Sequence, residues 1–142
     1  MRRSDTTANS LRGRLFAAAF AFVMWGGWAL LANWHGGHQN ALMSGLLQGS
    51  ASAVITLLMA LCATALFARL PGPVLLRIIL PPVLIVAVTF NALWLAHTAN
   101  ATPSLWLTIL PPSCVAFAYC LYLTLSLARN NRRHSPEQQL ND

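Results

Sequence analysis

Acidic side chains are almost missing from this sequence of 142 residues. The chain has three of them, and none lies between Asp5 and Glu137. A Ser-His-Asp catalytic set and a carboxylate-rich metal site therefore cannot be built in the central part of the chain. For the same reason we do not expect proton coupling through a membrane-embedded glutamate. We expect no enzyme activity and no bound cofactor.

Lysine is absent too, and the nine basic residues are all arginines. They form three clusters: Arg2, Arg3, Arg12 and Arg14; Arg69 and Arg77; and Arg129, Arg132 and Arg133. Two long segments between these clusters, Leu15–Ala68 and Ile78–Ala128, contain no charged residue. An ionised side chain at the centre of a bilayer costs about 3 kcal/mol on insertion scales. This distribution predicts an integral membrane protein.

Paired cysteines are a third absence. Cys62, Cys114 and Cys120 all lie in apolar runs, and no Cys-x-x-Cys motif is present. Thiol–disulfide exchange needs paired, accessible thiols, so the cysteines are interpreted as small buried apolar residues. The net charge of +6 is attributed to arginines that meet anionic lipid headgroups, and no nucleic-acid partner is expected.

Long apolar runs are what the sequence does contain. A helix needs about 20 apolar residues to cross the hydrocarbon core of a membrane. Residues 15–128 are predicted to form the membrane domain, between a basic tail of residues 1–14 and a disordered tail of residues 129–142. The predicted spans are about 15–33, 41–67, 74–96 and 105–127. Connectors this short predict an all-α, antiparallel four-helix transmembrane bundle.

The arginines also predict the orientation of the bundle. Positively charged loops stay on the cytoplasmic side of a membrane. All three arginine clusters lie in the two tails or around the second connector, residues 68–73. The other two connectors, residues 34–40 and 97–104, have no arginine. We therefore expect a multi-pass protein of the cell inner membrane with both termini in the cytoplasm.

The second span carries a stripe of small and polar residues at intervals of four. Gly45, Gly49 and Ala53 recur beside a row of polar residues: Ser44, Gln48, Ser52 and Thr56. Residues four apart share one face of a helix, and small residues let two helices approach closely in lipid. The stripe predicts a helix contact, either within the chain or between two copies.

Buried amides need partners in hydrocarbon. Gln48 in the second span and Asn91 in the third are predicted to lie at similar depth and to face each other, with Ser52 in the same polar layer. One interpretation is a hydrogen bond that joins the two helices. The alternative is a small polar cavity that receives a headgroup, a sugar or a quinone carbonyl.

The tetrapeptide Ile-Leu-Pro-Pro occurs twice, in the third and the fourth span. Its prolines are Pro81, Pro82, Pro111 and Pro112. Proline inside a helix removes one backbone donor and clashes with the preceding turn, so a kink is expected in both spans. Two oppositely placed kinks are reminiscent of the broken helices of transporters, although two bent helices in a small bundle explain them as well.

Three histidines are predicted on the outer side. His35 and His38 belong to the first outer connector, and His97 opens the other. Three imidazoles at one end of a bundle form a weak candidate for a haem or metal site. The favoured interpretation is a pair of helix-linking turns with no metal, since glycines beside His35 suit a tight turn.

The segment from Trp34 to Ser52 contains a Trp-His-Gly turn and the stretch Leu-Leu-Gln-Gly-Ser-Ala-Ser. It resembles small uncharacterised four-helix bacterial inner-membrane proteins, some of which accompany lipid or pigment assembly genes. The resemblance implies an accessory or scaffold subunit of a membrane or envelope-lipid assembly complex, with other membrane subunits or a second copy as partners. The alternatives are a small translocator of a lipid or lipid-linked substrate, and a haem, metal or quinone site on the outer face.

Overall fold

The structure is a computed structural model that describes the backbone of residues 3–138 and the side chains of residues 11–132. Within that part of the chain every regular element is helical. The elements are α1 (Arg3–Ala32), the short 3₁₀ helix η1 (Trp34–Gly36), α2 (His38–Arg69), α3 (Val74–Ala99) and α4 (Leu105–Gln138). The four α-helices are long and apolar enough to cross a membrane. The prediction of an all-helical chain with four apolar spans is confirmed.

The helices run further than the predicted spans. α1 begins at Arg3, inside the predicted tail of residues 1–14. α4 continues to Gln138, into the tail of residues 129–142 for which the sequence predicts disorder. Arginine, leucine and alanine favour helix, and no proline interrupts the chain between Pro112 and Pro136. Residues 1–2 and 139–142 lie outside the described residues.

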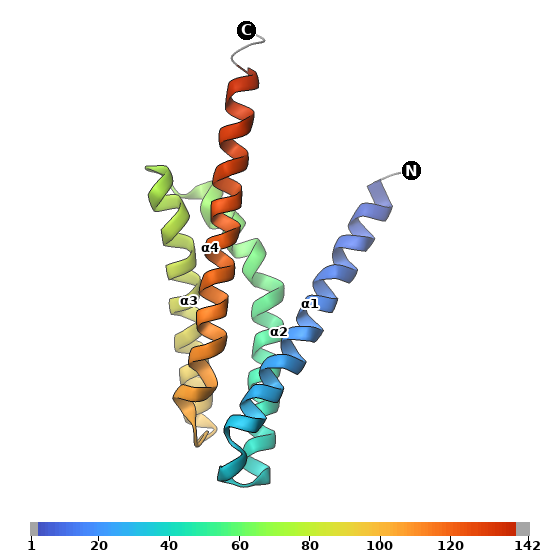
Figure 1. The fold of residues 1–142 in the computed structure, drawn as a ribbon, viewed down its shortest axis with the longest axis vertical. Coiled ribbons are helices and arrows are strands. Elements are labelled where there is room, and N and C mark those ends of the chain that lie inside the picture. The colour runs from blue at the N-terminus through green and yellow to red at the C-terminus, as the bar shows by residue number, and fades with distance from the viewer. Residues whose placement is uncertain (1–2, 139–142) are drawn as a thin grey trace.

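Helix α2 holds the others together. It contacts α1, α3 and α4, whereas α1 has no contact with α3 and a small one with α4. Figure 1 shows α1 crossing α2 near the connector end and diverging from α4 toward the N-terminus. The first turns of α1 and the last turns of α4 lie at one end of the molecule, and the connector between α3 and α4 lies at the other (Figure 1). The four helices therefore leave a V-shaped gap between α1 and α4.

The contact between α1 and α2 uses the predicted small residues. A Cβ atom added to Gly26 of α1 would lie 2.9 Å from the carbonyl oxygen of Gly45, and one added to Gly49 would lie 2.8 Å from the carbonyl oxygen of Phe22. Distances this short mean that the two backbones touch. Gly45 and Gly49 of α2 thus lie against α1, a helix of the same chain. Ala53 is half-buried.

Both proline pairs lie inside continuous helices. Proline has no N–H group, so the carbonyl four residues before it loses its helical partner. Pro82 leaves the carbonyl of Ile78 free, and the hydroxyl of Thr124 on α4 donates to it at 2.8 Å. Each such carbonyl becomes a place where a neighbouring helix can donate a hydrogen bond.

The second proline pair is used in the same way. Pro111 leaves the carbonyl of Leu107 free, and the indole Nε1–H of Trp28 on α1 donates to it at 2.8 Å. The repeated tetrapeptide therefore joins α3 to α4 and α4 to α1. The kinks themselves stay a prediction.

Candidate functional site

A hollow lined by all four helices lies between α1 and α4. It has a volume of about 410 Å³. Its wall is mostly apolar and aromatic, and includes Phe20, Met24, Trp25, Ile55, Met59, Leu93, Val115 and Tyr119. No arginine or acidic residue lines it. We call this hollow the α1–α4 cavity.

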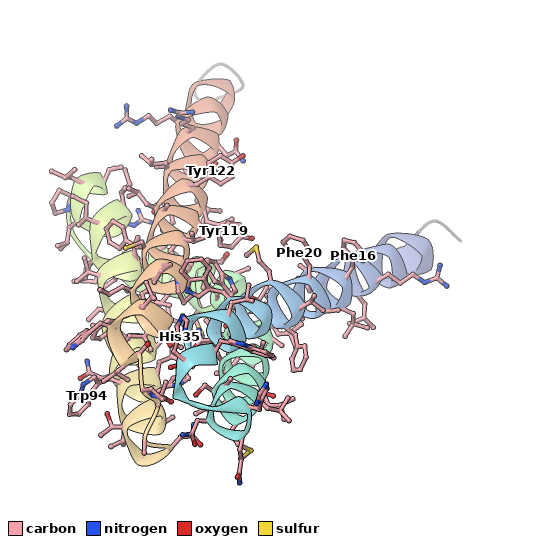
Figure 2. The ribbon with its side chains drawn as sticks, turned by 60° about the horizontal axis from the view of Figure 1, so that its bottom comes forward. Phe16, Phe20, His35, Trp94, Tyr119 and Tyr122 are labelled. Atoms are coloured by element: carbon pink, nitrogen blue, oxygen red, sulfur yellow. The ribbon has the colours of Figure 1, made fainter. Side chains whose placement is uncertain are left out.

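The α1–α4 cavity is open at its side. Phe20, Val115 and Tyr119 line it and are also exposed, at 58%, 52% and 45% of their surface. Figure 2 shows Phe16 and Phe20 on α1 and Tyr119 on α4 beside the gap between the two helices. An apolar ligand can therefore enter between α1 and α4 without unfolding either helix.

The polar groups of the cavity wall fall into two sets. The hydroxyls of Thr89 and Ser113 donate to carbonyls of their own helices, at 2.9 and 2.7 Å. The indole N–H of Trp25 and the hydroxyls of Thr56 and Tyr119 make no hydrogen bond with any described residue. The first set is satisfied by the protein, and the second is available to a ligand.

The predicted pairing of Gln48 with Asn91 is wrong. The amide of Asn91 is exposed and donates to the carbonyl of Ala87 in its own helix, at 2.7 Å. Gln48 is fully buried, and its Oε1 lies 2.8 Å from Nε2 of His97. The prediction failed because it compared only the depths of the two residues along their helices. Asn91 lies on the exposed side of α3.

The polar layer around Gln48 is an ordered chain of hydrogen bonds. The amide of Gln48 donates to the hydroxyl of Ser52 at 3.4 Å, so these two residues of the predicted polar layer are in contact. Oε1 of Gln48 must then accept from Nε2–H of His97, which leaves Nδ1 to accept from Thr102 at 2.9 Å. The hydroxyl of Thr102 accepts in turn from Ser44 at 3.2 Å. This chain joins the α3–α4 connector to α2, and Ser52 at its end lines the α1–α4 cavity.

The three candidate metal ligands do not come together. His97 is fully buried, in the last turn of α3 and not in an exposed connector. His35 and His38 are exposed, and the ring of His38 packs edge-on against Trp34. Among the described residues no three side chains of His, Cys, Asp or Glu lie close enough to hold a metal ion.

A second buried cluster joins the α1–α2 connector to the α3–α4 connector, and sequence reasoning missed it. The side-chain oxygen of Asn33 accepts from the backbone N–H of Ser104 at 2.7 Å, and its amide donates to Thr108 at 2.8 Å. Asn33 is 1% exposed. An asparagine at the end of an apolar span was a usable signal, but its partners lie more than 70 residues away along the chain. This cluster fixes the end of α1 to the start of α4.

The arginines whose side chains the structure describes lie toward the other end of the molecule, near the start of α1, the α2–α3 connector and the end of α4. Arg14 and Arg69 border an open groove between α1 and α2. Nε of Arg77 donates to the carbonyl of Phe67 at 3.0 Å, and its guanidinium lies 4.6 Å from the centre of the Phe67 ring. Arg77 thereby stabilises the carboxyl end of α2, where a cation is favourable.

Comparison with known proteins adds no relative. No protein-family model, no curated protein and no solved structure matches this chain.

Proposed function

We propose that the chain is an accessory protein of envelope-lipid assembly in the cell inner membrane, and that it holds one lipid or lipid-linked molecule in the α1–α4 cavity. The observation that carries this proposal is a laterally open, uncharged cavity lined by all four apolar helices. In a bilayer such an opening meets lipid chains directly.

The size of the cavity favours a lipid chain over a partner helix. Pockets for small ligands measure about 300–1,000 Å³, and the α1–α4 cavity, at about 410 Å³, lies in that range. One turn of an α-helix, about 5.4 Å long and 10–12 Å across, takes roughly 500 Å³. A helix that docked there would need several turns, which is much more than the cavity holds.

The proposed orientation follows the arginines. With both termini and the α2–α3 connector in the cytoplasm, Arg14 and Arg69 lie where anionic headgroups collect. Each basic residue near such a surface contributes about 1 kcal/mol. The helices then form an antiparallel bundle whose α1–α4 opening lies within the hydrocarbon.

The accessory role is part of the same proposal. A partner subunit cannot use the Gly45–Gly49 face of α2, because α1 already covers it. The uncharged wall of the cavity supports holding a molecule, and the partner subunits would carry out its conversion. The outer rim of Trp34, His35 and His38 stays exposed for such a partner.

A bulky side chain at the cavity wall tests the proposal. Ala17 is an exposed residue of α1 that lines the cavity, and Ala19 is an exposed residue of the same helix that does not. We expect native mass spectrometry of the purified protein to find one lipid retained per chain. The change Ala17→Trp should reduce that occupancy at least fivefold, because the indole ring takes up cavity space.

Ala19→Trp is the matched control and should keep the occupancy of the unchanged protein. If no lipid is retained by the unchanged chain, or if Ala17→Trp and Ala19→Trp retain it equally, the α1–α4 cavity is not the binding site.

A further inference from the structure

One threonine of the cavity wall differs from the other threonines of the apolar helices in the hydrogen bonding of its hydroxyl. Threonine in an apolar helix usually satisfies its hydroxyl by donating to a carbonyl one turn back. Thr64, Thr89 and Thr98 do so, at 2.8, 2.9 and 2.7 Å. Thr56 makes no such bond in the described structure, although it lies in the middle of α2 and lines the cavity. Its hydroxyl is free to donate into the cavity.

Two further free donors line the same cavity from other helices. They are the hydroxyl of Tyr119 on α4 and the indole N–H of Trp25 on α1. A polar group without a partner in an apolar medium costs several kcal/mol, and bilayer hydrocarbon supplies none. Three unpaired donors in one cavity therefore call for a ligand with an acceptor.

The chemistry of the wall restricts that acceptor. The indole N–H can only donate, and the two hydroxyls have hydrogens to donate. No arginine lines the α1–α4 cavity, so a phosphate group has no countercharge there. Arg14 and Arg69 border the separate groove between α1 and α2. An uncharged oxygen acceptor on a hydrocarbon body fits these groups best.

Position along the helices agrees with this assignment. At 1.5 Å per residue, Thr56 and Tyr119 lie about 27 and 21 Å from the connector ends of α2 and α4. Both hydroxyls therefore lie well inside their helices, far from the connector ends. Ser52, one turn from Thr56, accepts a hydrogen bond from Gln48, whereas Thr56 makes no hydrogen bond with any described residue.

We propose that the α1–α4 cavity selects an uncharged lipid that carries a carbonyl oxygen, and that Thr56 and Tyr119 donate hydrogen bonds to that oxygen. This inference rests on the proposed function, and it adds the class of ligand. Ester lipids without a charged headgroup and prenylated quinones share this chemistry.

The test compares three probes with the purified full chain in nanodiscs. The probes are a diacylglycerol, a prenylated benzoquinone and squalane, an isoprenoid hydrocarbon with no oxygen. Two hydrogen bonds of about 1 kcal/mol each should make the better carbonyl probe bind about 10–30-fold more tightly than squalane. The carbonyl probe that binds more tightly identifies the source of the carbonyl.

Substitutions that preserve shape complete the test. The double change Thr56→Val and Tyr119→Phe should reduce the preference for the carbonyl probe to about twofold or less, while squalane binds as before. Tyr122 is an exposed tyrosine of α4 that does not line the cavity, so Tyr122→Phe should leave the preference unchanged. A variant that lost squalane binding as well would be misfolded, and single changes at the two positions would then replace it, each with an expected loss of about fivefold.

The two ways of failing are distinct. If squalane and the carbonyl probes bind equally, or if the double change leaves the preference intact, the carbonyl assignment is wrong and the lipid-binding function stands. If none of the three probes binds the unchanged chain, the proposed function fails with it.

Discussion

Replacement of His97 by alanine is expected to lower the free energy of unfolding by about 2–4 kcal/mol. The imidazole is fully buried and satisfies Gln48 on one side and Thr102 on the other. Its removal leaves the carbonyl oxygen of Gln48 without its donor and the hydroxyl hydrogen of Thr102 without its acceptor in an apolar environment, and it leaves a void. The measurement is an unfolding titration with sodium dodecyl sulfate in mixed micelles, followed by far-ultraviolet circular dichroism.

His35 provides the control for this change. It is exposed in η1, so His35→Ala should change the unfolding free energy by less than about 0.5 kcal/mol. Equal effects at the two positions would mean that the hydrogen-bond chain through His97 does not stabilise the fold.

The change Gly26→Ala is expected to destabilise the protein by about 1–3 kcal/mol, the usual cost of forcing an extra methyl group into a packed contact. The new Cβ would lie 2.9 Å from the carbonyl oxygen of Gly45, and backbone cannot rotate away as a side chain can. α1 would have to move away from α2, and the α1–α4 cavity would change shape. The same detergent titration measures the loss.

The neighbouring glycine makes a closely matched control. A Cβ added to Gly27 would have no atom within 4 Å, and alanine is the better helix former by about 1 kcal/mol. Gly27→Ala should therefore leave stability unchanged or raise it. If Gly26→Ala were as well tolerated as Gly27→Ala, the close approach of α1 and α2 would be wrong.

Much of the fold could be predicted from the sequence because lipid imposes a simple rule. Charge is excluded from the hydrocarbon, so the two charge-free stretches between the three arginine clusters mark the apolar part of the chain, and each stretch holds two spans. Small residues at intervals of four point to a helix contact, and Gly45 and Gly49 make one. These are local patterns on a single helix, and a single sequence shows them.

The polar contacts could not be predicted in the same way. Depth along a helix places Gln48 and Asn91 at one level, but the rotation of α3 decides which side chain faces α2. That rotation brings His97 to Gln48 and turns Asn91 outward. The α1–α4 cavity depends on the angle at which α1 leaves α2, a property of four packed helices. Sequence patterns therefore could not identify Trp25 and Tyr119 as residues of the cavity wall.

The most direct test of the central claim asks what surrounds the opening between α1 and α4. A nitroxide attached to a cysteine at position 119, in a chain whose natural cysteines are replaced by alanine, can be probed in liposomes by its collisions with oxygen and with a water-soluble nickel chelate. We predict that the label at 119 is accessible to oxygen and protected from nickel, whereas a label at the exposed position 35 shows the reverse. A label at 119 that nickel reaches as readily as it reaches position 35 would place the opening in water and contradict the account.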